Sequence, residues 1–236
     1  MSEKKLKLDE VEVLAKKLRL DLGLDLDGPI HTKTILRKEN ILTAYRPMSD
    51  KAYGLSLKCG GHKFMLINSN NMRGRQHFTI AHELYHLYLE DNPKPHLCTN
   101  GKSTEEYNAD LFASAFLMPV EGIYKNIPKK ELVEKQISLA TVLLLEQYFS
   151  VSRLALLVRL DRLNLLRKGL FNELKSIPII KSAREYGYDL SLYQKGNEGV
   201  FVGDFGVIAR QLFDDEKISE GHYVELLNQI MPNEKD

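Results

Sequence analysis

The chain has 236 residues, 43% of them hydrophobic and 28% charged, which is typical of a globular protein with a buried core. Its formal net charge is +1, which excludes a general electrostatic attraction to nucleic acid or to anionic membranes. The longest apolar runs have the length of residues 142–145, so we expect no membrane helix. The two cysteines, Cys59 and Cys98, are too few for a disulfide framework, so we expect a cytoplasmic protein.

The first third of the chain contains helical and then strand-like patterns. Apolar residues between charges predict an amphipathic helix over residues 9–20, and a short helix is expected over residues 33–38. Three strand-like segments follow, ILTAYRP, AYGLSLKC and KFMLINS, and the sequence CGGH at residues 59–62 joins the last two as a hairpin. These segments predict a small antiparallel sheet.

The rest of the chain is mainly helical in pattern. The apolar period predicts a helix over residues 73–90 and a second one over residues 103–118. Two further amphipathic helices are expected over residues 129–148 and 151–166. Residues 171–236 combine two strand-like pieces, GYDLSLYQ and GVFVGD, with one or two terminal helices.

The helix expected over residues 73–90 contains the sequence HELYH. His82 and His86 project from the same face of a helix one turn apart, so both imidazoles can bind one zinc ion. Glu83 lies about 100° further round the helix, where its carboxylate can act as general base on a metal-bound water. The simpler alternative is an ordinary amphipathic helix that holds two histidines.

A catalytic zinc site needs a third protein ligand, and the next helix offers carboxylates. Glu105 and Glu106 lie in its first turn, and Asp110 follows Glu106 at a spacing of four residues. One of the pair Glu106 and Asp110 can therefore bind the metal while the other orients a histidine. Ser103 and Glu106 also have the spacing of a capping box, in which case Glu105 is the alternative ligand. The spacing alone leaves both open.

Two motifs occur in a fixed order along the chain: RQHFTIAHELYHLYL at residues 75–89 and EYNADLFASAFLMP at residues 106–119. Together they resemble the ImmA/IrrE family of zinc metallopeptidases. The resemblance covers residues 10–166 and extends more faintly to KISEGHYVELL at residues 217–227. Asp110 stands where asparagine is usual in the family, and a carboxylate there can still orient a histidine.

The resemblance implies a set of roles for these residues. His82, His86 and Glu106 would be the ligands of one zinc ion, Glu83 the general base, and Asp110 a carboxylate that orients a histidine. The implied function is a zinc-dependent endopeptidase that cleaves a helix-turn-helix transcriptional repressor and so relieves repression. The segment AYGLSLKC, as an edge strand, is where a substrate could add as a further strand. A zinc-bound regulator that grips a repressor without cleaving it is the alternative.

We expect an α+β fold in three parts. Residues 1–127 would form a zincin-like metallopeptidase core, with the small antiparallel sheet packed on the active-site helices. Residues 128–168 would form a helical, helix-turn-helix-like segment, and residues 169–236 a small mixed C-terminal subdomain of unknown role. His96 and Cys98 are expected to be loop residues rather than a second metal site.

A DNA-binding regulator without catalysis is a lesser alternative, suggested by the short turn between the helices expected at residues 139–148 and 151–166. A recognition helix needs polar side chains along one face, whereas leucines crowd residues 151–166, which favours core packing. The arginines of this region are expected to form a solvated face: Arg153, Arg159, Arg162 and Arg167. Direct binding of nucleic acid is therefore not expected.

Overall fold

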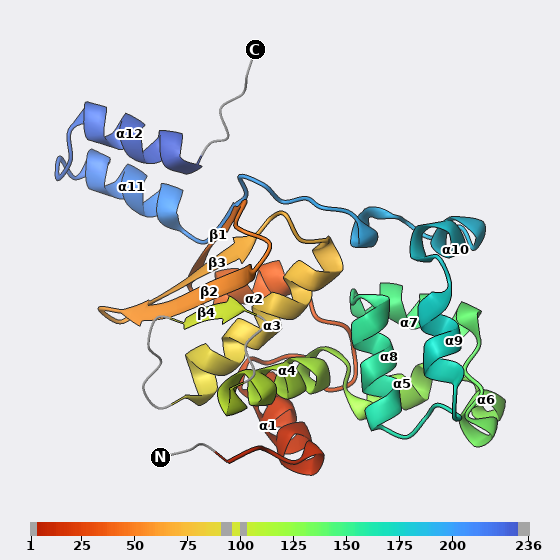
Figure 1. Ribbon diagram of the computed structural model, residues 1–236. Helices are drawn as coiled ribbons and strands as arrows, with labels where there is room; N and C mark the ends of the chain where they lie inside the picture. Colours follow the sequence, from red (N-terminus) through yellow and green to blue (C-terminus); the bar gives the residue numbers. More distant parts are fainter. Residues whose placement is uncertain (1–3, 91–95, 100–102, 231–236) are drawn as a thin grey trace.

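The computed structural model describes residues 4–90, 96–99 and 103–230, and Figure 1 shows their arrangement. Within these residues the chain folds into twelve α-helices, one 3-10 helix and a single sheet of five strands. The predicted α+β class is confirmed. The division at residues 127 and 168 stays a prediction.

The sheet has the strand order β4-β2-β3-β1-β5. Its strands are β1 (Ile41–Arg46), β2 (Ala52–Cys59), β3 (His62–Asn68), β4 (His96–Thr99) and β5 (Phe201–Val202). The predicted hairpin is confirmed, because Gly60 and Gly61 turn the chain with positive φ angles and β3 runs antiparallel to β2. The expectation of a wholly antiparallel sheet was wrong, because β1 pairs with the other edge of β3 in the parallel direction. Alternation of apolar residues predicts strands but does not give their order.

Two helices before β1, one between β3 and β4 and one after β4 form the body of the molecule. They are α1 (Leu8–Asp21), α2 (Thr32–Lys38), α3 (Arg73–Leu89) and α4 (Thr104–Leu117), close to the predicted ranges. Helix α3 packs on β2 and on α4, and α4 packs on α1 (Figure 1). The sheet therefore covers one side of α3 and α4 covers another, which buries eleven residues of α3, the HELYH sequence included.

Helix α4 is fixed at both of its ends. At its start, the Ser103 hydroxyl accepts a hydrogen bond from the Glu106 backbone N–H at 3.2 Å, as an N-cap does. At its end, the Nε atoms of Arg19 and Arg159 donate to the carbonyl oxygens of Phe116 and Met118 at 2.8 and 3.0 Å. These carbonyls have no partner within the helix, so the two buried arginines satisfy them.

Four helices follow α4: α5 (Val120–Asn126), α6 (Lys129–Glu134), α7 (Leu139–Phe149) and α8 (Arg153–Arg162), and the last three lie in the predicted helical segment. The single helix expected over residues 129–148 is divided, because Lys135 adopts a left-handed backbone conformation with φ 50°. The expected solvated arginine face was wrong in part, since Arg153 and Arg159 are buried in the core. Arg153 Nε donates to Glu146 Oε1 at 2.6 Å, whereas Arg162 and Arg167 are exposed.

No single helix in the described part of the chain is long and apolar enough to cross a membrane. Helices α7 and α8 meet the same criteria of length and composition only as a pair, and they are bent by 107° relative to each other.

The C-terminal part begins with α9 (Leu170–Ser176), α10 (Ile179–Glu185) and the 3-10 helix η1 (Ser191–Tyr193). The segment GYDLSLYQ was expected to be a strand, and this was wrong: it contains η1, and the Asp189 side chain accepts a hydrogen bond from the Ser191 backbone N–H in a local turn. GVFVGD does contain a short strand, β5, which pairs with β1. A helical hairpin of α11 (Phe205–Asp214) and α12 (Glu220–Ile230) follows β5, and Figure 1 shows it to one side of the sheet.

Candidate metal centre

His82 and His86 lie on the buried face of α3 and turn their rings toward the same point. Both side chains are almost inaccessible to solvent, and their Nε2 atoms are 3.2 Å apart. The i, i+4 spacing in a regular helix explains this geometry, because it places the two Cβ atoms one above the other. The two histidines are therefore brought together as predicted.

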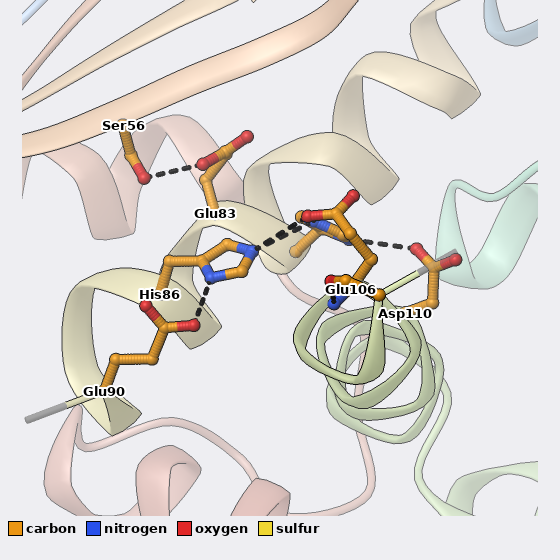
Figure 2. A network of polar contacts seen from close by, with 8 residues as sticks. Ser56, Glu83, His86, Glu90, Glu106 and Asp110 are labelled. Atoms are coloured by element: carbon orange, nitrogen blue, oxygen red, sulfur yellow. Dashed lines mark hydrogen bonds and ion pairs between the residues drawn. The ribbon is translucent and has the colours of Figure 1, made fainter. Parts of the chain in front are cut away.

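Each histidine has a carboxylate on its other ring nitrogen. His82 Nδ1 lies 2.9 Å from Asp110 Oδ1, and His86 Nδ1 lies 2.6 Å from Glu90 Oε1 (Figure 2). A carboxylate accepts, so each Nδ1 donates its N–H, and in the neutral ring Nε2 then presents a lone pair. Two such lone pairs at 3.2 Å repel each other unless a cation or a proton lies between them.

Glu106 completes the cluster from α4. Its Oε1 atom lies 3.7 Å from the Nε2 atoms of both His82 and His86, and its side chain is buried. One ligand atom from each of these residues lies within 4.8 Å of the others. Half of the predicted capping box is formed, through Ser103, but the Glu106 carboxylate faces the histidines. Glu105 is absent from the cluster.

The donor set fits a zinc ion by its chemistry. Two imidazole nitrogens and one carboxylate oxygen are the protein ligands of a common class of catalytic zinc site. The carboxylates behind His82 and His86 hold the rings in the tautomer that a metal requires. Three converging donors, buried and already oriented, are what such an ion needs from its protein.

The charge state of His82 follows from these contacts. Burial opposes its positive charge, but hydrogen bonds to Asp110, Cys98 and Glu106 favour that charge and raise the pKa of His82 well above its ordinary value. A metal that binds at Nε2 must therefore displace a proton, so metal affinity falls as the pH is lowered.

Glu83 is fully buried beside the histidines, on the side of α3 that faces β2. The Ser56 hydroxyl, on β2, donates a hydrogen bond to Glu83 Oε2 at 2.6 Å (Figure 2). Gly54 lies two residues earlier on the same strand, and a Cβ at this position would come within 2.6 Å of Thr79 Cγ2 and 3.3 Å of Glu83 Oε1. The glycine therefore lets β2 approach α3 and leaves room for the Glu83 carboxylate.

Cys98 lies beside the same cluster, which corrects the expectation of a loop residue. It is on β4 and is buried, and its sulfur, a ring nitrogen of His82 and a carboxylate oxygen of Glu83 lie within 4.8 Å of one another. Burial raises the pKa of the Cys98 thiol, although the hydrogen bond with His82 opposes this shift. The side chain of His96 lies outside the described residues.

Comparison with known proteins agrees with the geometry. The sequence profile of the M78 peptidase family, described as the IrrE N-terminal-like domain, matches residues 36–161, which is more than half of the chain. The chain belongs to this family. The resemblance to the ImmA/IrrE peptidases is therefore confirmed, and the matched range contains every residue of the site described above, from β2, α3, β4 and α4.

Similarity to curated proteins and to solved structures is weaker than the match to the family. No curated protein matches it. Among solved structures, it is similar to a Mycobacterium tuberculosis transcriptional regulator at 17% sequence identity and a TM-score of 0.44. That likeness covers 65% of this chain and 46% of the regulator, so the chain spans less than half of that structure.

Proposed function

We propose that the protein is a zinc-dependent endopeptidase that works in the cytoplasm and cleaves a helix-turn-helix transcriptional repressor. The observation that carries the proposal is the convergence of the His82, His86 and Glu106 donor atoms beside the buried Glu83 carboxylate. The family of the chain supports peptidase chemistry. The resemblance to ImmA/IrrE peptidases supports a repressor as the substrate.

In this mechanism His82, His86 and Glu106 would hold one zinc ion. When bound, zinc supplies a Lewis acid that lowers the pKa of a bound water and polarises the scissile carbonyl. Glu83 takes a proton from the attacking water and passes it to the leaving amine. Ser56 holds the carboxylate of Glu83 in place, while Asp110 and Glu90 keep the imidazoles oriented.

Metal analysis tests the site directly. We expect about one zinc ion per chain in the purified wild-type protein and its loss in His82→Ala and in Glu106→Gln. His62→Ala is a matched control, because His62 is exposed on β3 and outside the cluster. Glu105→Gln should keep the metal. Zinc retained in full by His82→Ala would refute the metal site.

Glu83→Gln separates catalysis from binding. The amide keeps the shape of the side chain but cannot accept the water proton, so this variant should retain zinc and lose cleavage. The assay is incubation with the repressor encoded nearest the gene, with and without a chelator, followed by mass spectrometry of the fragments. Cleavage by Glu83→Gln at the wild-type rate would refute the peptidase mechanism. Repressor binding without fragments in the wild type would favour a non-cleaving regulator.

A further inference from the structure

Strand β4 covers the edge of β2 next to the candidate metal centre. The two strands are antiparallel, and their register pairs Gly54 with Cys98 and Ser56 with His96. Two of the β2 residues that pair with β4 therefore contact Glu83: Gly54 leaves room for its carboxylate, and Ser56 donates a hydrogen bond to it. The expectation that AYGLSLKC is an edge strand was wrong, because β4 occupies the side of β2 where a peptide substrate was expected to add.

Cys98 brings a metal-binding atom to that edge. Its sulfur lies within 4.8 Å of both a ring nitrogen of His82 and a carboxylate oxygen of Glu83, and the residue is 5% exposed. A water activated in the proposed mechanism must touch the metal and also reach Glu83, so it belongs on the same side of the histidines. The Cys98 sulfur therefore stands on the side where the attacking water is required.

A thiolate at this point changes the kind of site that the chain offers. Zinc takes thiolate ligands at about 2.3 Å and is four-coordinate in closed structural sites, whereas catalytic sites keep one position open for water. The sulfur meets the cluster at His82, the one residue shared by the groups His82, His86, Glu106 and His82, Glu83, Cys98. A cysteine ligand added to His82, His86 and Glu106 makes four protein donors. The site is then closed to water.

We propose that Cys98 is the fourth ligand of the zinc ion in the resting protein, and that β4 closes the active site until a substrate strand displaces it. This inference rests on the proposed zinc site. On opening, Cys98 leaves the metal and takes up a proton from solvent, and a water molecule takes the position that the sulfur vacates. Glu83 then has the water that its proposed role requires.

The ladder between β4 and β2 is short, so a substrate strand can replace it. β4 has four residues, pairs with one neighbour at the edge of the sheet, and has an irregularity between the pairs of Ala52 and Gly54. A longer substrate strand can make the same backbone hydrogen bonds to β2 and more of them. The bonds lost when β4 leaves are thereby replaced.

Cobalt substitution tests the ligand without relying on activity. Cobalt(II) bound by a thiolate has a sulfur-to-metal charge-transfer band in the near ultraviolet, which nitrogen and oxygen ligands do not produce. We expect this band in the wild type and in Cys59→Ala, and its loss in Cys98→Ala and Cys98→Ser. Cys59→Ala is the matched control, because Cys59 is the other cysteine and is exposed at the end of β2. Circular dichroism confirms that each variant is folded.

Zinc affinity and cleavage rate give two further readouts. Loss of an outer-shell partner alone weakens metal binding about 10- to 100-fold. Loss of a ligand should therefore weaken zinc binding by at least about tenfold. Cys98→Ala should cleave the repressor faster than the wild type when zinc is saturating, because the water position is open. Cobalt binding without the charge-transfer band, or a band that persists in Cys98→Ala, would overturn the inference and leave the zinc site intact. Failure of the wild type to bind cobalt at all would refute the proposed function.

Discussion

At the scale of single residues, the two histidines differ in the carboxylate that supports each one. Asp110 approaches His82 from α4 with 59% of its side chain exposed, whereas Glu90 follows α3 and supports His86 with 20% exposed. A hydrogen bond to a charged group is weaker where water screens it. Glu90 should therefore contribute more to the orientation of its histidine than Asp110 does.

We expect Glu90→Ala and Asp110→Ala each to weaken zinc binding by about 10- to 100-fold, as loss of an outer-shell partner does. The larger effect should come from Glu90→Ala, because its carboxylate is the less exposed of the two. Competition with a fluorescent chelator at constant pH measures both affinities. Glu105→Ala is the control, and it should stay within about twofold of the wild type by the same reasoning. Equal losses for Glu105→Ala and Asp110→Ala would contradict this assignment of partners.

The sequence predicts those site residues that a helical period connects. His82, His86, Glu106 and Asp110 are related by spacings of four residues within α3 or α4, and a helix fixes what such a spacing means. Glu90 stands four residues after His86, so the same rule could have found it. Residues from the strands could not be found in this way: Ser56 and Cys98 reach the site through strand order and register, which no local pattern encodes.

At the scale of elements, helix α4 positions Glu106, and its far end depends on two buried arginines. Arg159 is inaccessible to solvent, donates to the Met118 carbonyl oxygen and also binds Glu12 Oε1 of α1. One guanidinium thus joins α8, α4 and α1. A planar fork with several donors can do this, whereas a lysine ammonium on a flexible stem cannot reproduce its geometry.

Arg159→Lys should therefore lower the free energy of unfolding by about 2–4 kcal/mol, because it leaves buried partners without their donors. Arg162→Lys is the matched control on the same helix: Arg162 is exposed, and this change should stay within about 0.5 kcal/mol. Urea unfolding followed by circular dichroism, without added metal, measures both. Coincident unfolding curves for the two variants would show that Arg159 does not have this structural role.

The elements themselves were predicted to different degrees. The two helices of the site were expected over residues 73–90 and 103–118, and the structure has them at Arg73–Leu89 and Thr104–Leu117. Their boundaries are marked by side chains that act locally, such as the N-cap Ser103. The division after residue 134 follows from the left-handed backbone of Lys135, which no apolar period shows. The burial of Arg153 and Arg159 depends on partners distant in sequence. Polar composition alone assigns such arginines to the surface, and this is why that expectation failed.

At the scale of the whole molecule, His77 connects three parts of the chain. Its Nδ1 atom lies 3.0 Å from the carbonyl oxygen of Ser150, in the turn between α7 and α8, and its Nε2 atom lies 3.1 Å from that of Ile30, before α2. The ring itself belongs to the first half of α3. These contacts span 73 and 47 residues of sequence, so no periodicity could have predicted them. They join the helix of the candidate metal centre to the elements on either side of it.

This junction should make the stability of the protein sensitive to pH. Burial disfavours the charged ring and outweighs the two carbonyl contacts, which lowers the pKa of His77 to about 4 from an ordinary value of 6.5. Between these values the unfolded chain binds a proton that the folded chain does not, so this contribution to stability is complete above pH 6.5 and is lost as the pH falls toward 4. The slope from this one group is at most about 1.4 kcal/mol for each pH unit.

Urea unfolding with a chelator present, compared between the wild type and His77→Gln, isolates the contribution of His77. The difference in unfolding free energy between the two proteins should shrink on acidification and stay constant above pH 7. A difference independent of pH would mean that His77 keeps its ordinary pKa in the folded protein.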